Sequence, residues 1–152
     1  MPETEVPVFR RAVVALNGGP SDARIVRLVA SQATRTRSEI IAVHVVEIDW
    51  TLPLDADIAG RSEEVQRVLD VAEGIADGYK QSMDAVLLQA RDVGAAIVDE
   101  ATERGADLLV VGLPYRKRFG GEFAIGRTIP YILQNAPCTV WVVREPMSEE
   151  PA

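Results

Sequence analysis

The sequence predicts an α/β fold, a three-layer sandwich in which helices cover both faces of a parallel sheet. Five short apolar runs alternate with four segments of helical periodicity along the 152 residues. The runs are apolar at nearly every position, as expected for strands that are buried on both faces of a sheet. No linker long enough to divide the chain lies between them, and the crossovers are expected to be right-handed.

The predicted strands are short runs bounded by turn or polar residues. The first run ends at Asn-Gly-Gly-Pro, which is a strong turn signal. The five strands are placed at residues 12–16, 40–46, 84–90, 107–112 and 139–143.

The predicted helices carry apolar residues at helical spacing and span residues 21–33, 62–81, 93–105 and 127–136. Ser62 is the expected N-cap of the second helix, and Thr128 that of the fourth, with Pro130 in its first turn. Asp92 lies near the start of the third helix. One stripe marks the buried side of the second helix: Val65, Leu69, Ala72, Ile75 and Tyr79.

Composition narrows the classes of function. The length predicts one domain over residues 8–145, with flexible tails at 1–7 and 146–152. A formal net charge of −7 opposes binding to nucleic acid. No apolar run reaches the roughly 18 residues that a membrane helix needs, so membrane insertion is not expected. The single cysteine, Cys138, excludes an intrachain disulfide and suits a cytoplasmic location.

The segment at residues 110–128, VVGLPYRKRFGGEFAIGRT, is rich in glycine and positive charge. Glycines allow main-chain amides to converge on an anion, and a helix N-terminus follows, so the segment is a candidate phosphate cradle. Its cations could grip phosphate oxygens. A mobile connection with a solvated basic face has the same composition, so the pattern leaves both interpretations open. The glycines and cations are Gly112, Gly120, Gly121, Gly126, Arg116, Lys117, Arg118 and Arg127.

Catalytic chemistry has little support in the sequence. His44 lies inside an apolar strand and is expected to be a packed, hydrogen-bonded imidazole. No histidine, cysteine or carboxylate cluster has metal-site spacing. Ser21 and Ser82 have no visible base partner. We therefore do not expect an enzyme, although slow ATP hydrolysis stays open.

Four segments of the chain, in this order, resemble the universal stress protein family. They are AVVALNGGPSDARIV, IIAVHVV, GADLLVVG and GRTIPYILQNAPCTVWVVRE. The resemblance implies a Rossmann-like, adenine nucleotide alpha hydrolase-like sheet of five strands in the order 3-2-1-4-5. It also implies a homodimer in which the last strands, Thr139, Val140, Trp141, Val142 and Val143, run antiparallel. Many members bind an adenine nucleotide, and a second branch binds none.

The chain departs from the family's binding motif, Gly-x2-Gly-x9-Gly followed by Ser or Thr. Gly112 fits the first position, but Tyr115 stands at the second. Gly126 fits the third only with one extra loop residue, and Arg127 replaces the hydroxyl, which comes one place late at Thr128. The altered loop is expected to hold a nucleotide differently, to prefer fewer phosphates, or to hold none.

An adenine pocket is implied between the ends of the first two strands, at Ala15, Leu16, Asn17 and Val45. Asn17 replaces a common aspartate and should be a poorer Mg²⁺ ligand. Asn17 is also simply a good turn former. Trp50 could cover the ligand mouth or touch a neighbour.

Two functions are therefore carried forward. The first is a stress-related regulatory protein that binds ATP, ADP, AMP or cAMP, with or without Mg²⁺, and reports it to an unidentified client protein. The alternative is a ligand-free dimeric scaffold that acts by protein contact. The candidate binding residues are Ala15, Leu16, Asn17, Val45, Gly112, Tyr115, Arg116, Gly120, Gly121, Gly126, Arg127 and Thr128.

Overall fold

The computed structural model describes residues 7–53, 63–113, 117–118, 122–123 and 126–147, the two short pairs by their backbone alone. Five parallel strands form the main sheet, in the order β3-β2-β1-β4-β7. The strands are β1 (Arg11–Leu16), β2 (Glu39–Glu47), β3 (Asp84–Ala90), β4 (Leu108–Leu113) and β7 (Thr139–Arg144). This is the predicted 3-2-1-4-5 arrangement, and the fold class is confirmed.

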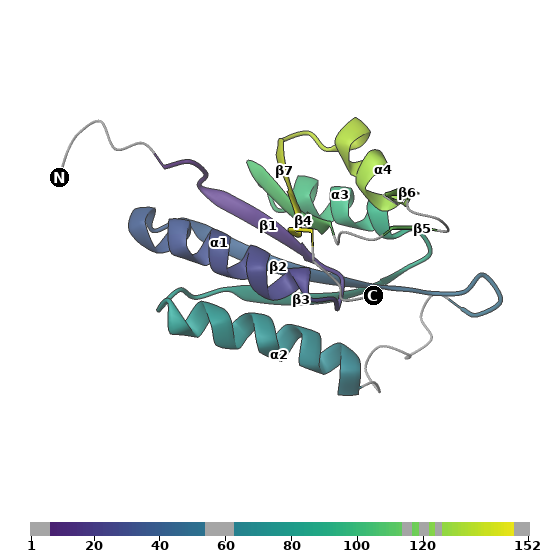
Figure 1. The fold of residues 1–152 in the computed structure, drawn as a ribbon, viewed down its shortest axis with the longest axis horizontal. Helices are drawn as coiled ribbons and strands as arrows, with labels where there is room; N and C mark the ends of the chain where they lie inside the picture. Colours follow the sequence, from purple (N-terminus) through teal and green to yellow (C-terminus); the bar gives the residue numbers. More distant parts are fainter. Residues whose placement is uncertain (1–6, 54–62, 114–116, 119–121, 124–125, 148–152) are drawn as a thin grey trace.

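Two helices cover each face of this sheet (Figure 1). The helices α1 (Ser21–Thr36) and α2 (Glu63–Gly78) pack on one face. The helices α3 (Val93–Glu103) and α4 (Thr128–Asn135) pack on the other. The three-layer sandwich is thus present, with a separate apolar core on each side of the sheet.

The two cores arise from the alternation of side chains along each strand. On β1, Val14 and Leu16 face α1 and α2, whereas Val13 and Ala15 face α3 and α4. All four are buried, because β1 is the central strand. Continuous apolar runs are therefore required in the middle of the sheet, and this is why the strands could be predicted from the sequence.

The described helices differ from the predicted ones at their ends. Helix α1 runs on to Thr36 and stops at Arg37, whose φ is 56°. Helix α2 ends at Gly78, and its buried side includes Ala76, while Tyr79 is exposed. The expected N-cap Ser62 lies outside the described residues. Helix ends are set by capping and local packing, which a periodic pattern does not resolve.

Two details near the candidate loop correct the sequence analysis. Strand β4 continues through Gly112 to Leu113, so Gly112 lies within the strand. Thr128 is the first residue of α4, and Arg127 occupies the N-cap position without a side-chain cap bond. A hydroxyl next to a helix start predicts a cap, but here the chain has already turned into the helix.

A small antiparallel pair of strands follows β4. Lys117–Arg118 forms β5 and Glu122–Phe123 forms β6. Strands of two residues have no measurable period, so they could not be predicted from the sequence. The predicted tails lie largely outside the described residues, at 1–6 and 148–152. Within the part of the chain that the structure describes, no helix is long and apolar enough to cross a membrane.

Candidate functional site

A central hollow of about 310 Å³ lies at the carboxyl ends of β1, β2 and β4. The N-terminal residues of α3 and α4, Val93 and Thr128, complete its wall. Ligand sites of open parallel sheets lie at this edge, where the strand order reverses. Here β1 is followed by β2 on one side and flanked by β4 on the other, so the hollow occupies that switch point.

Six of the predicted binding residues line this central hollow together. They come from four separate segments of the chain: Ala15, Leu16, Asn17, Val45, Gly112 and Thr128. Apolar residues that the sequence analysis did not single out complete the floor, among them Ile97, Val111 and Ile129. They belong to the core stripes of α3, β4 and α4, and no sequence signal separates them from other core residues. An apolar floor with polar groups at its rim suits a flat aromatic ring.

Val45 lies where the pairing of two strands ends. The register between β1 and β2 runs up to Leu16 opposite His44, one residue before Val45. On its other side, Val45 pairs with Leu88 of β3. The main chain of β2 therefore passes the hollow without a β1 residue beside it, which is the arrangement that a ligand edge could complete.

The turn after β1 is held by side chains. The Oδ1 atom of Asn17 accepts a hydrogen bond from the Gly19 N–H at 2.7 Å. The Asp22 carboxylate accepts from the N–H groups of Asn17 and Gly18 at 2.9 and 2.8 Å. Gly18 has a φ of 83°, which favours glycine. Because Oδ1 is engaged within the turn, coordination of Mg²⁺ by Asn17 would cost this bond.

Asp22 is a buried acid that serves this turn. Burial is the largest influence on it and raises its pKa above the ordinary value, while the hydrogen bonds from Asn17 and Gly18 act in the opposite direction. The other helix-start acid, Asp92, accepts from the Ala95 N–H at 3.1 Å and caps α3. Both acids therefore have structural roles next to the start of a helix.

Gly112 is required by a contact on the opposite face of the sheet. A Cβ atom at this position would lie 2.6 Å from the Cβ of Ser21, at the start of α1. The Ser21 hydroxyl donates to Glu145 Oε1 at 2.5 Å, and the Glu145 N–H donates to the Leu113 carbonyl at 2.8 Å. Gly112 is a candidate phosphate-cradle residue in the sequence, and close packing of α1 on β4 gives a second reason for a glycine at this position.

The entrance to α4 combines a helix N-terminus that has no side-chain cap with the cation of Arg127. Gly126 has a φ of 81°, a conformation that other residues rarely adopt. Because Arg127 provides no side-chain cap, the first N–H groups of α4 are not satisfied in that way. These amides and the positive end of the helix dipole favour an anion here. The Arg127 side chain is exposed beside them.

A second hollow, the Trp50 hollow, adjoins the central one. It has a volume of about 570 Å³ and shares Val93 and Thr128 with the central hollow. Trp50 and Arg127 are among its lining residues. The two cavities thus meet at the N-terminus of α4.

Arg91 organises the wall of the Trp50 hollow. Its guanidinium donates to the carbonyls of Asp49 and Leu52 at 2.9 and 3.0 Å. The same group lies 4.8 Å from the ring centre of Trp50, which is 80% exposed. A cation over an indole face is attractive, so Arg91 fixes both the loop and the ring. The sequence analysis missed Arg91; its position directly after β3, at the ligand edge, was the available signal.

His44 is the packed imidazole that the sequence predicted. It is buried, and its Nδ1 lies 3.2 Å from the Leu16 carbonyl oxygen. Among the described residues, no three histidine, cysteine or acidic side chains are grouped to hold a metal ion. Four predicted residues, Tyr115, Arg116, Gly120 and Gly121, lie outside the described residues.

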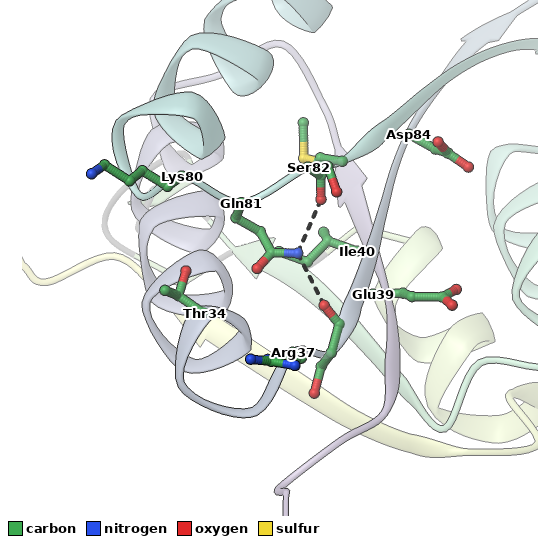
Figure 2. Close-up of a pocket in the computed structure, with 10 residues that line it drawn as sticks. Thr34, Arg37, Glu39, Ile40, Lys80, Gln81, Ser82 and Asp84 are labelled. Carbon is green, nitrogen blue, oxygen red and sulfur yellow. Dashed lines mark hydrogen bonds between the residues drawn. The ribbon is translucent and has the colours of Figure 1, made fainter.

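A polar hollow of about 510 Å³ lies at the other end of the sheet. Figure 2 shows its walls, the turn from α1 to β2 and the turn from α2 to β3. The Gln81 side chain ties these turns together by donating to the carbonyls of Ser38 and Ser82, both at 3.0 Å. This is the amino-terminal edge of β2 and β3, where ligand sites of parallel sheets are not found, so we assign it a structural role.

Comparison with known proteins adds a family to this geometry. Residues 9–144 match the sequence model of the universal stress protein family. The sensor protein KdpD of Mycobacterium tuberculosis (strain CDC 1551 / Oshkosh) is 29% identical over 136 residues, 90% of this chain. The chain spans only 14% of that longer protein.

Two solved structures show the same fold. A universal stress protein in complex with cAMP has a TM-score of 0.67 and 19% identity, covering 89% of this chain and 96% of its own. The universal stress protein from Archaeoglobus fulgidus in complex with dAMP has a TM-score of 0.68 and 21% identity, covering 90% of this chain and 98% of its own.

Proposed function

This chain belongs to the universal stress protein family, and from that premise we propose that it is a regulatory protein that binds an adenine nucleotide. The base occupies the central hollow, and the phosphate lies at the N-terminus of α4. One observation carries the proposal: residues from four separate segments line one apolar hollow directly beside the uncapped start of α4.

Each part of the site has a role in this proposal. The apolar floor at Ile97 and Ile129 receives the flat face of the base. The main chain of β2 near Val45 offers hydrogen-bonding groups to the edge of the base. The N–H groups of Thr128 and its neighbours, with the Arg127 guanidinium, hold the phosphate. The solved relatives with cAMP and dAMP support this ligand class.

A nucleotide with few phosphates fits this arrangement better than Mg²⁺-bound ATP. The Oδ1 atom of Asn17 is engaged by Gly19, and an amide is a weaker ligand for Mg²⁺ than a carboxylate. Arg127 supplies positive charge without a metal. We therefore expect AMP or cAMP to bind at least as well as ATP with Mg²⁺.

Binding, and not catalysis, is the activity that we propose. The buried His44 is hydrogen-bonded to a backbone carbonyl, and Asp22 and Asp92 are both engaged in turns or caps. These groups already have structural hydrogen-bond partners, which supports binding over catalysis. The nucleotide would act as a signal that a client protein reads.

Calorimetry tests the proposal directly. ATP, ADP, AMP and cAMP are titrated into the protein, and small molecules are extracted from freshly purified samples. We expect micromolar binding of at least one nucleotide, weakened about tenfold by Arg127→Ala through the loss of a charge-assisted hydrogen bond. Arg24→Ala, an exposed arginine on α1, is the matched control and should bind normally. Absence of binding to all four, with no co-purified nucleotide, would refute the proposal.

The ligand-free scaffold is the second candidate, and one observation favours it. Gly112, the first glycine of the binding motif, is explained by its contact with Ser21, without any phosphate. In that case the fold would act through its surfaces alone, and the same calorimetric experiment would give no heat.

We also propose a homodimer formed through β7. This strand is at the edge of the sheet, and such edges invite pairing. Val142 on β7 is 37% exposed. Trp141 instead packs against Phe9, with ring centres 6.3 Å apart and planes at 88°, so it supports β7 from within.

A further inference from the structure

The outer faces of α1 and α2 carry opposite charges. The two helices pack beside each other on one face of the sheet (Figure 1). The single acid of α1, Asp22, is buried at the turn. Three arginines on α1 are exposed, namely Arg24, Arg27 and Arg35. Helix α2 has one base, Arg67. Its five acids are all exposed: Glu63, Glu64, Asp70, Glu73 and Asp77. We call this two-helix surface the α1–α2 face.

Two arginines of the α1–α2 face have no acidic partner in the part of the chain that the structure describes. Among the described residues, neither Arg24 nor Arg27 has a carboxylate within ion-pair distance. Asp70 accepts a hydrogen bond from Gln66 of its own helix, at 3.0 Å. Arg24, Arg27 and the acids of α2 are exposed and can therefore meet opposite charges on another molecule.

Apolar side chains lie on the same face. Leu28 on α1 is 37% exposed, and Val71 on α2 is 46% exposed. A hollow of about 620 Å³ separates the start of α1 from α2, and Ala23, Val68 and Val71 are among its lining residues. A contact centre with apolar residues and a charged rim is the usual composition of a protein interface.

We propose that the α1–α2 face pairs with the same face of a second copy of this chain, with α1 of each copy lying on α2 of the other. Both helices connect parallel strands, so they run in the same direction. A two-fold axis parallel to the helices, in the plane of contact, places each basic helix over the partner's acidic one. The perpendicular in-plane axis would place like charges together, so the charges select one geometry.

The size of this face sets the strength of the pairing. Each helix has 16 residues, or about 24 Å of length, so the contact is at the small end of specific interfaces. The net charge of −7 also makes whole copies repel one another. At about 0.15 M salt this long-range repulsion is largely screened, while contact pairs persist; at 1 M the pairs are screened as well. We expect weak association that is strongest at intermediate salt.

Sedimentation of the full chain at about 0.15 M and 1 M NaCl tests the proposal. Arg24→Glu/Arg27→Glu makes both helices acidic, and Asp70→Lys/Glu73→Lys brings the formal charge of α2 from −4 to zero beside the basic α1. We expect each variant alone to lose the self-association that depends on salt, with the dissociation constant raised at least about tenfold. An equimolar mixture of the two variants should regain this association. A dimer through β7, which relies on main-chain pairing, would persist at 1 M NaCl and is thereby distinguished.

A matched charge change on the opposite layer is the control. Asp99→Lys/Glu103→Lys replaces two exposed acids of α3 and changes the formal charge by the same amount. This variant should keep the self-association that depends on salt. Circular dichroism is used to check that every variant is folded. Loss of association in the α3 control as well, or no salt-sensitive association of the unmodified chain up to about 100 µM, would overturn the proposal.

Discussion

Gly112 and Ser21 pack against each other so closely that neither a methyl group nor a larger side chain fits between them. A Cβ on Gly112 would stand 2.6 Å from the Ser21 Cβ and 3.6 Å from a methyl of Ile25. The nearest atom belongs to a short side chain on a helix backbone, so it cannot swing away. The start of α1 would have to shift away from β4.

Gly112→Ala should therefore destabilise the fold by about 1–3 kcal/mol, as expected for overpacking in a core. Gly74→Ala is the control, because a Cβ at Gly74, inside α2, meets nothing within 4 Å. That change should stabilise the protein by about 0.5–1 kcal/mol. Urea denaturation gives both values. Equal effects of the two substitutions would show that Gly112 is not tightly packed.

This pair also shows what sequence reasoning about the site could not supply. Gly112 matched the first position of a nucleotide-binding motif, and that match gave no information about the helix behind it. Ser21 is distant in the chain, and its approach depends on how α1 packs on β4. A motif predicts which residues occur at a site, but it does not tell which neighbour requires each of them.

The fold itself followed from local pattern. The run at residues 12–16 is apolar at every position because β1 is central and has a core on each face, so strand and layers could be predicted together. The hollow around Ala15 and Val45 was located only through family resemblance. Arg91 was not predicted, because its contacts with the carbonyls of Asp49 and Leu52 depend on the path of a loop.

Asp22 should give the stability a distinct dependence on pH. Because burial raises its folded-state pKa above 3.8, the folded state holds this proton more tightly than the unfolded state. Its contribution to stability is therefore largest below pH 3.8 and falls as the pH rises from 3.8 through the raised pKa.

The comparison with Asp22→Asn isolates this effect, because asparagine does not titrate. The free energy of unfolding is measured for both proteins between about pH 3 and pH 7, the range in which carboxylates titrate. The advantage of the unmodified protein over the variant should shrink as the pH rises. A constant or growing difference would mean that hydrogen bonds from Asn17 and Gly18 outweigh burial.

Arg91→Ala should loosen the loop that follows β2. The substitution removes two hydrogen bonds to the carbonyls of Asp49 and Leu52 and the cation over Trp50. Hydrogen exchange of residues 48–53 is expected to accelerate severalfold, and the Trp50 emission should shift. Exposed contacts of this kind contribute little to global stability, so unfolding should change by less than about 1 kcal/mol.

Arg104→Ala provides the matched control for that measurement. Arg104 pairs with Glu100 at 2.7 Å and with Asp84 at 3.5 Å, near the opposite edge of the sheet. Its loss should leave exchange at residues 48–53 unchanged. If Arg91→Ala also leaves that segment unchanged, the loop is held by other contacts, such as the hydrogen bond from Ile48 N–H to the Ala90 carbonyl.

Val142→Lys should weaken the proposed dimer through β7. Antiparallel pairing of two β7 strands would bring the substituted positions of both copies into the same short interface, and a lysine on an edge strand discourages pairing. We expect the dissociation constant to rise at least about tenfold, or 1.4 kcal/mol, in light scattering at micromolar concentration. Leu133→Lys, on α4 and 57% exposed, changes a similar apolar residue outside β7 and should leave the mass unaltered. A monomeric unmodified protein would refute the dimer. A dimer that tolerates Val142→Lys but not Leu133→Lys would show that the interface lies on another surface.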